Sequence, residues 1–208
     1  MNKKIQPIVR LIDDDPTVLD SQSFFLRLCG WQTVTYSNAK DFLELDDLLH
    51  PGCVVLDVRM PGMTGLELQD EIIHRKIDLP IIFLSAHGDI EMAIACLQKG
   101  AFNFLEKPAE PEKLQKLVEE AIKKNQIDRR ETDYKNGLKK AFEGLTKSEK
   151  QIAYLVAKGL SNPEISQLLS ISERTVQAHR SAVYEKLGVT NAVELADFVR
   201  DMAGGKGI

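Results

Sequence analysis

The chain has 208 residues, of which 43% are hydrophobic and 28% charged, and its formal net charge is −4. This is the composition of an ordinary globular protein, long enough for one large domain or two modest ones. The acid is unevenly distributed, because residues 1–125 carry a net charge of −6 and residues 145–200 a net charge of +1.

Targeting signals and cysteine chemistry are not expected. Two lysines near the start are followed by an aspartate triplet before any apolar segment forms, and no stretch holds 18 uninterrupted apolar residues. Neither secretion nor a membrane-spanning segment is therefore expected. Cys29, Cys53 and Cys96 are odd in number and lack metal-ligand spacing, which favours reduced core residues of a cytoplasmic protein.

Residues 1–108 alternate short apolar runs with amphipathic segments. The apolar runs predict five strands, at Ile8–Ile12, Thr33–Tyr36, Cys53–Leu56, Ile81–Leu84 and Phe102–Leu105. The segments between them predict helices at 16–28, 38–49, 65–76 and 88–99. This alternation is typical of an α/β fold, a (βα)5 doubly wound parallel sheet with helices on both faces.

The sequence from Pro111 onward is rich in helix formers, and its apolar stripe ends at about Ile127. It predicts a last helix that continues into a polar linker, and it leaves open whether residues 128–140 are helical. We therefore expect a domain at 1–125, a partly helical linker at 126–143 and a second domain at 144–208.

The last segment contains several helix start and stop signals, namely Thr146 with Glu149, Asn162-Pro163, Ser172, Gly188 and Asn191 with Glu194. They divide it into four helices, two of which are joined by the tight turn at residues 170–172. A small all-α domain with a helix-turn-helix is expected.

Acidic side chains stand at the ends of predicted strands. In a parallel sheet of order 2-1-3-4-5, Asp13, Asp14 and Asp57 would converge at the carboxyl edge, where ligands bind. Mg²⁺ would relieve the repulsion between them, and an acid sharing a site with Mg²⁺ can act as a nucleophile toward phosphorus. Lys107 and Ser85, at two other strand ends, supply a positive charge and a hydroxyl for the transferred oxygens.

LIDDDP, VVLDVRMPGMTG, IIFLSAHGD and GAFNFLEKP, in this order and spacing, resemble the flavodoxin-like receiver domain of two-component response regulators. The resemblance implies that Asp57 is the phospho-acceptor. It also implies that Asp13, Asp14 and Asp57 hold Mg²⁺ together with the backbone carbonyl of Arg59.

The same resemblance assigns the residues that respond to phosphorylation. Lys107 and Ser85 would bind the phosphoryl group, and Ser85 and Phe104 would act as the switch pair. Phe104 has no hydroxyl, so its two states can differ only by packing.

The third helix of the last segment has distinct faces. At 100° per residue, Val176, Val183 and Leu187 define its buried side, and Arg174, Gln177, Ala178, Ser181 and Glu185 face away from it. Short and polar residues on an outward face suit the major groove, where glutamine can pair with adenine. Arg180 and Lys186, nearer the buried side, are expected to reach phosphates.

The stretch from Leu145 to Val189, above all TVQAHR and KLGV, resembles the LuxR-type helix-turn-helix and puts the chain beside the FixJ and NarL groups of regulators. The expected DNA contacts are Arg174, Thr175, Gln177, Ala178, Arg180, Ser181 and Lys186.

These features predict a cytoplasmic transcription regulator, not a metabolic enzyme. A sensor histidine kinase would phosphorylate Asp57, and the phosphorylated chain would form a homodimer that binds promoter DNA and meets RNA polymerase. Two alternatives remain open, a DNA-binding regulator that does not use phosphate and an adaptor that binds only proteins. A hydrolase of small phosphate esters is disfavoured, because Arg59 occupies the position where a second acid would be needed.

Overall fold

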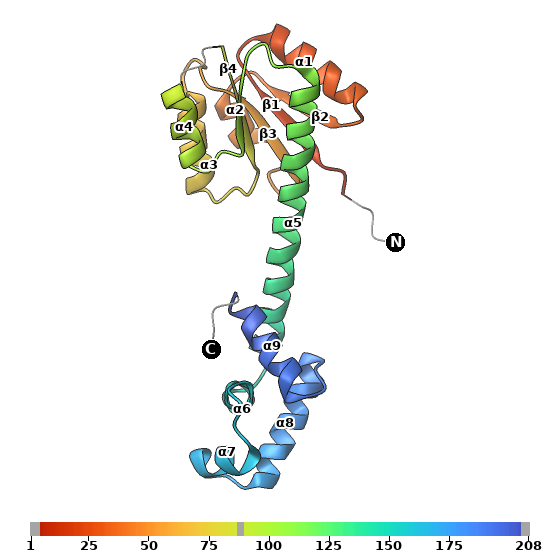
Figure 1. Cartoon of the computed structure of the whole chain (residues 1–208), viewed down its shortest axis with the longest axis vertical. Helices are drawn as coiled ribbons and strands as arrows, with labels where there is room; N and C mark the ends of the chain where they lie inside the picture. The colour runs from red at the N-terminus through yellow and green to blue at the C-terminus, as the bar shows by residue number, and fades with distance from the viewer. Residues whose placement is uncertain (1–4, 87–89, 205–208) are drawn as a thin grey trace. The chain divides into compact units, whose positions relative to one another are not determined.

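The computed structural model describes residues 5–86 and 90–204. The chain divides into two compact units, Met1–Asp128 and Arg129–Ile208, here called the N-terminal unit and the C-terminal unit (Figure 1).

The N-terminal unit contains one parallel sheet. Its strands are β1 (Ile8–Ile12), β2 (Gln32–Tyr36), β3 (Gly52–Asp57), β4 (Ile81–Ser85) and β5 (Asn103–Glu106). Their order is β2-β1-β3-β4-β5, with every neighbouring pair parallel. The predicted strands and their order are confirmed, so the carboxyl ends of β1 and β3 lie next to each other.

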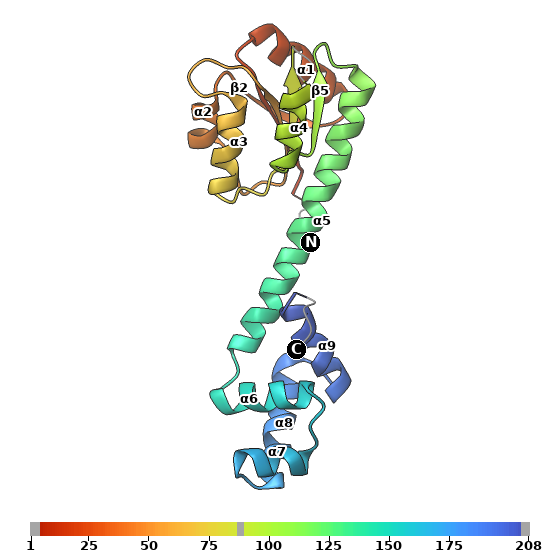
Figure 2. The same cartoon turned by 60° about the vertical axis from the view of Figure 1, so that its left-hand side comes forward.

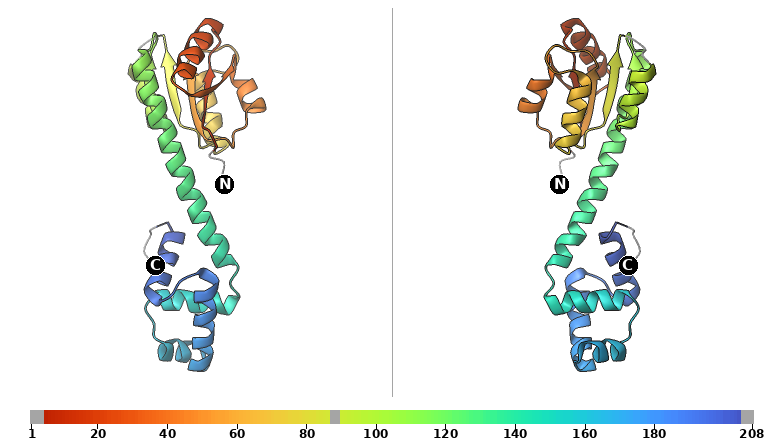
Figure 3. Two further views of the ribbon diagram at one scale, coloured as in Figure 1. Left: turned by 90° about the vertical axis from the view of Figure 1, so that its right-hand side faces the viewer. Right: turned by 90° about the vertical axis from the view of Figure 1, so that its left-hand side faces the viewer.

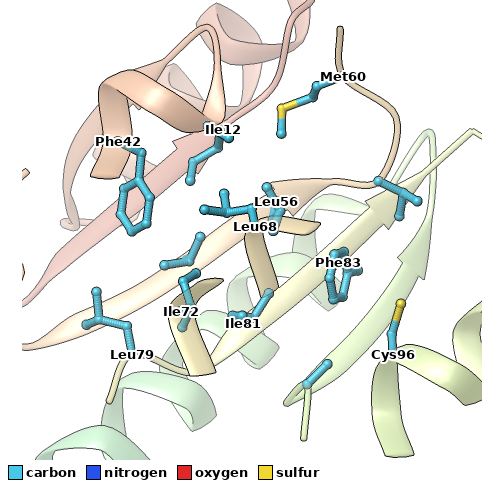
Figure 4. Packing of buried hydrophobic residues seen from close by; sticks show 14 residues of the cluster. Ile12, Phe42, Leu56, Met60, Leu68, Ile72, Leu79, Ile81, Phe83 and Cys96 are labelled. Atoms are coloured by element: carbon cyan, nitrogen blue, oxygen red, sulfur yellow. The ribbon is translucent and has the colours of Figure 1, made fainter. Parts of the chain in front are cut away.

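Helices cover both faces of this sheet. They are α1 (Pro16–Leu28), α2 (Ala39–Leu45), α3 (Gly65–His74), α4 (Ile90–Gln98) and α5 (Pro111–Glu143). Helices α1 and α5 lie on one face of the sheet, and α2, α3 and α4 lie on the other (Figure 2). On each face the buried side chains form one cluster with the sheet. Figure 4 shows the cluster on the face of α2, α3 and α4, in which Phe42, Leu68 and Phe83 lie together.

The end of α2 differs from expectation, and the expected start of α4 lies outside the described residues. Helix α2 ends at Leu45, whereas the sequence predicts a helix to residue 49. The next residue, Asp46, leaves the helix with an extended backbone and forms an ion pair with Arg10 at 2.8 Å. For α4, the described residues begin at Ile90, so the predicted start at residue 88 lies outside them.

Arg10 is a fully buried charge in the middle of β1. Besides Asp46, its guanidinium donates hydrogen bonds to the backbone carbonyls of Ile8, Asp47 and His50. A buried cation is tolerated only when it is paired and hydrogen-bonded, and here both conditions are met. The loop between α2 and β3 is thereby tied to the core of the sheet.

Helix α5 is continuous from Pro111 to Glu143, so residues 128–140, which the sequence left open, are helical. Asn125 fixes α5 to the amino end of β3. Its buried side chain accepts a hydrogen bond from Gly52 N–H (2.9 Å) and donates one to the carbonyl of Asp78 (2.7 Å).

The C-terminal unit consists of the end of α5 and the helices α6 (Lys147–Ala157), α7 (Asn162–Leu169), α8 (Glu173–Leu187) and α9 (Ala192–Met202), drawn in two further views in Figure 3. Phe142 joins its buried core and meets Tyr154 edge to face. Thr146 and Glu149 form the predicted capping box, and Gly188 ends α8 in a left-handed conformation.

The part of the chain that the structure describes contains no helix with the length and apolar content to cross a bilayer. All three cysteines are free thiols; Cys53 and Cys96 are buried, as expected for core residues, and Cys29 is half-buried.

Asn125→Ala tests the attachment of α5 to the sheet. The substitution leaves the N–H of Gly52 and the carbonyl of Asp78 without this partner, and it should lower the free energy of unfolding of the N-terminal unit by about 2 kcal/mol. Trp31, the only tryptophan of the chain, reports this unit alone, so urea unfolding is followed by its fluorescence. Lys123→Ala, at an exposed position of the same helix, serves as the control. Equal midpoints for the two variants would contradict the role of Asn125.

Candidate functional site

The carboxyl edge of the sheet brings together three charged side chains. Asp57 is the last residue of β3, Asp13 directly follows β1 and Lys107 directly follows β5. The ammonium of Lys107 lies 2.6 Å from Asp13 Oδ2 and 2.6 Å from Asp57 Oδ1. Both carboxylates are nearly buried, at 3% and 6% residue exposure. One lysine therefore bridges two acids that come from neighbouring strands.

The remaining oxygens of the two acids accept backbone hydrogen bonds. Asp57 Oδ2 accepts from the N–H of Arg59 at 2.7 Å, and Asp13 Oδ1 accepts from the N–H of Asp15 at 3.0 Å. Asp15 itself caps α1 by accepting from the N–H of Thr17, as its position before Pro16 suggests. The loops after β1 and β3 thus hold each carboxylate in a fixed orientation.

Burial and pairing act in opposite directions on these groups. Burial by itself would lower the pKa of Lys107, but the hydrogen bonds that its ammonium donates to Asp13 and Asp57 outweigh burial, and the pKa is raised. Burial raises the pKa of Asp13, and the hydrogen bond from Lys107 offsets only part of this shift. Lys107 is therefore held in its charged form, ready to bind further anionic oxygens.

The donor set suits a hard cation. Mg²⁺ accepts one or two carboxylates and keeps several waters, and Asp13 and Asp57 offer two oxygen-donor groups that already share a cation, the Lys107 ammonium. Asp14, the third expected ligand, is exposed to solvent. Over residues 5–86 and 90–204, no group of three or more His, Cys, Asp and Glu side chains is arranged to hold a metal. Lys107 thus bridges Asp13 and Asp57, and the role of Asp14 as a third metal ligand stays a prediction.

Ser85 and Phe104 lie on the strands beside Asp57. Ser85 ends β4 and is 2% exposed, and its carbonyl accepts a hydrogen bond from the N–H of Lys107 at 2.7 Å. Phe104, on β5, is partly buried against the cluster that contains Phe83 and Cys96. The fold therefore brings Ser85 to the same sheet edge as the charged residues and leaves Phe104 between core and surface.

The glycine-rich loop after Asp57 has a steric role. A Cβ on Gly65 would lie 2.2 Å from the carbonyl oxygen of Asp57, which no side chain tolerates, and the N–H of Gly65 donates to the carbonyl of Val58. The first residue of α3 thus packs directly on the backbone that carries Asp57. Sequence inspection identifies the glycine but not this contact.

The C-terminal unit presents a second candidate site on α8. Val176, Val183 and Leu187 are buried, as the helical periodicity predicts. The residues Arg174, Thr175, Gln177, Ala178, Ser181 and Lys186 are exposed, and Arg180 is half-buried. The turn that joins α7 to α8 is closed by Ser166, whose hydroxyl donates to the carbonyl of Ile171 at 2.6 Å.

Two basic residues of α8 have partners inside the unit. The ammonium of Lys186 binds both carboxylate oxygens of Glu149, at 2.7 and 2.9 Å, and Glu149 is nearly buried. The guanidinium of Arg180 donates to Asn162 at 2.5 Å and to the hydroxyl of Tyr184 at 2.9 Å. The phosphate contacts expected of Arg180 and Lys186 stay a prediction, and to make them each side chain must exchange or share its partner on α6 or α7.

Comparisons with known proteins give a family for each unit of the chain. Residues 9–119 match the family model described as response regulator receiver domain, and residues 143–199 match that of bacterial regulatory proteins, luxR family. Transcriptional regulatory protein TdiR of Thauera aromatica is 40% identical over 194 residues, which cover 92% of this chain and 84% of that protein. Transcriptional regulatory protein FixJ of Azorhizobium caulinodans is 34% identical and covers 90% and 89%, respectively.

A solved structure shows the same likeness over most of the chain. The response regulator StyR, known at low resolution, superposes with a TM-score of 0.87 at 36% identity, covering 94% of this chain and 98% of that one. The chain therefore belongs to the response regulators that join a receiver domain to a LuxR-type DNA-binding domain.

Gly65→Ala should both destabilise the N-terminal unit and disturb Asp57. Because the new methyl group meets backbone atoms that cannot yield cheaply, the free energy of unfolding should fall by about 2–3 kcal/mol. Gly62→Ala is the matched control, since its methyl group meets open space and only its positive φ costs about 1 kcal/mol. Both are measured by Trp31 fluorescence in urea, and a smaller loss for Gly65→Ala than for Gly62→Ala would contradict the contact.

Lys186→Met tests the ion pair with Glu149. The pKa of Glu149 is lowered chiefly by its hydrogen bond from Lys186, so the pair stabilises the unit above the ordinary carboxyl pKa and the contribution is lost as pH falls through the folded-state pKa. Since Lys186 is about half exposed, the variant should lose only about 1 kcal/mol at neutral pH and show weaker destabilisation by acid.

The measurement for Lys186→Met is helix loss by circular dichroism, with Trp31 fluorescence separating the N-terminal unit. Lys147→Met, an exposed lysine at the start of α6, should unfold like the wild type. Wild-type stability of Lys186→Met, with weakened DNA binding alone, would instead assign Lys186 to phosphate contact.

Proposed function

We propose that Asp57 accepts a phosphoryl group from a sensor histidine kinase, and that this modification controls promoter binding by α8. The observation that carries the proposal is the Lys107 ammonium, 2.6 Å from the carboxylates of both Asp13 and Asp57. A cation held between two nearly buried acids at a sheet edge can stabilise the charge of a transferred phosphoryl group.

The proposed phosphoryl transfer uses side chains at the carboxyl edge of the sheet. A carboxylate oxygen of Asp57 attacks phosphorus, the bond from phosphorus to the kinase histidine breaks, and its electron pair returns to the imidazole. Lys107 then binds a phosphoryl oxygen in place of Asp57 Oδ1, and the hydroxyl of Ser85 donates to another. Mg²⁺, held by Asp13, Asp57 and the carbonyl of Arg59 with Asp14 nearby, would supply further positive charge for these oxygens.

The proposed switch follows from the movement of Ser85. As its hydroxyl turns toward the phosphoryl oxygen, it vacates space beside β5, and Phe104 rotates inward from its partly buried position. Phosphorylation then shifts a pre-existing equilibrium between two states of the N-terminal unit.

A homodimer is proposed as the output of that shift. Ile90, Ile94 and Leu97 on α4 are exposed, at 74%, 48% and 45% respectively, and a second copy would bury them. Two paired copies would present two α8 helices to promoter DNA, through Arg174, Thr175, Gln177, Ala178 and Ser181. RNA polymerase is the further partner proposed at the promoter, and the cytoplasm is the compartment that holds these partners.

The first experiment is phosphorylation by acetyl phosphate with Mg²⁺, read by intact mass. The wild type should gain one phosphoryl group, Asp57→Asn should gain none, and Lys107→Met should gain far less because the charge of Asp57 and of the phosphoryl oxygens is no longer balanced. Glu106→Gln, next to Lys107 and exposed, is the matched control and should behave like the wild type. A phosphoryl group on Asp57→Asn would refute the assignment of the acceptor.

The second measurement is DNA affinity and molecular mass in solution, with and without acetyl phosphate. The proposal requires a phosphate-dependent rise in both for the wild type and none for Asp57→Asn. Equal promoter binding by the two proteins would favour the regulator that does not use phosphate. Absence of DNA binding at any salt concentration would favour the adaptor.

A further inference from the structure

A chain of hydrogen bonds joins the start of α7 to the outward face of α8. Asn162, the first residue of α7, donates from Nδ2 to Oε1 of Gln177 at 2.8 Å and accepts at Oδ1 from Arg180 at 2.5 Å. Arg180 also donates to the hydroxyl of Tyr184, and its guanidinium lies over the Tyr184 ring, 5.7 Å from the centroid. Gln177 is the exposed end of this relay.

Chemistry fixes the direction of every bond in the relay. Arginine has only donors, so the side-chain atom of Asn162 that faces Arg180 must be its oxygen. The amide nitrogen of Asn162 then faces Gln177, and only the oxygen of Gln177 can accept from it. The orientation of both amides, which is otherwise open to exchange of oxygen and nitrogen, therefore follows from the charge of Arg180.

The relay is anchored at its inner end. The bond from Arg180 to Asn162 is charge-assisted, and such bonds are shorter and stronger than bonds between neutral groups. Asn162, Arg180 and Tyr184 are all half-buried, whereas Gln177 is exposed. Arg180 thus fixes the side chain of Asn162, and Asn162 in turn fixes the side chain of Gln177.

We infer that Asn162 determines which base Gln177 reads, by engaging its oxygen and leaving its two amide hydrogens outward. This inference rests on the proposed role of α8 in the major groove. A glutamine with both ends available pairs with adenine, donating to N7 and accepting from the N6 amino group. Guanine presents two acceptors, N7 and O6, so its recognition needs only the amide hydrogens of glutamine and no acceptor. Wild-type Gln177 should therefore prefer guanine.

The size of the preference follows from one hydrogen bond. Reading adenine with both ends requires Oε1 of Gln177 to leave or share its bond with Asn162, and a neutral hydrogen bond corresponds to roughly a fivefold change in an equilibrium constant. Removing Asn162 should therefore shift the ratio of adenine to guanine by roughly fivefold. Asn162 is a positioning residue in this scheme, and Arg180 positions Asn162.

The test is selection of binding sites from a random duplex library. Full-length protein treated with acetyl phosphate and Mg²⁺ is compared with Asn162→Ala and with Gln167→Ala, an exposed residue of the same helix that lies outside the relay. Alanine is well tolerated in the first turn of α7, whose cap residue is Ser161. All selections use one salt concentration, since affinity depends strongly on it.

At one base position of each half-site, the wild type and Gln167→Ala should select guanine, and Asn162→Ala should gain adenine by roughly fivefold. Gln177→Ala should lose the preference at that position in either background, which identifies the position as the one that Gln177 reads. The same base selected by the wild type and Asn162→Ala would overturn the inference and leave DNA binding intact. Failure of the wild type to enrich any sequence would overturn the proposed DNA-binding function and the inference with it.

Discussion

The ammonium of Lys107, held between the carboxylates of Asp13 and Asp57, is the interaction on which the N-terminal unit is organised. Two nearly buried acids on adjacent strands would each resist ionisation without a cation. Lys107 reaches them from β5, past the end of β4, and its own N–H is bonded to the carbonyl of Ser85. A lysine, two acids and a serine are therefore fixed relative to one another by the sheet alone, and the loops only orient them. Any group that binds Oδ1 of Asp57 must displace or share Lys107, which makes that lysine sensitive to the chemical state of the acid.

Much of this arrangement could be predicted from the sequence, because parallel strands buried on both faces are continuous apolar runs. The five runs give the strands, and in a sheet of the supposed order 2-1-3-4-5 the rule that ligands bind at carboxyl ends puts Asp13 and Asp57 together. Helix ends were less predictable where a side chain found a distant partner. Asp46 leaves α2 to meet Arg10, thirty-six residues earlier in the chain. The polar half of α5 is compatible with helix or linker, and only the structure decides between them.

Contacts between side chains of different elements were the part that sequence could not supply. Arg10 looks like an ordinary polar position on a strand, yet three backbone carbonyls and Asp46 bury it completely. On α8, periodicity correctly separates the buried face from the exposed one. It cannot show that Glu149 of α6 pairs with Lys186, or that Asn162 of α7 binds Arg180 and Gln177. A helical angle gives the direction of a side chain, and its partner depends on packing between helices.

These internal pairs bear on how the two units cooperate. Lys186 and Arg180 are engaged within the C-terminal unit, and Arg200 is paired with Asp197, so each of these three basic groups must give up or share a partner before it can neutralise a phosphate. Non-specific affinity for DNA rises with the number of phosphates neutralised, and a single copy with a small net charge binds weakly. In the proposed homodimer, binding of the second copy to DNA would be intramolecular, which would raise the overall affinity without adding contacts to either copy. In the proposed mechanism, weak binding by one copy is thus a condition for control by phosphorylation, because a C-terminal unit that bound promoters tightly alone would leave the state of Asp57 without consequence.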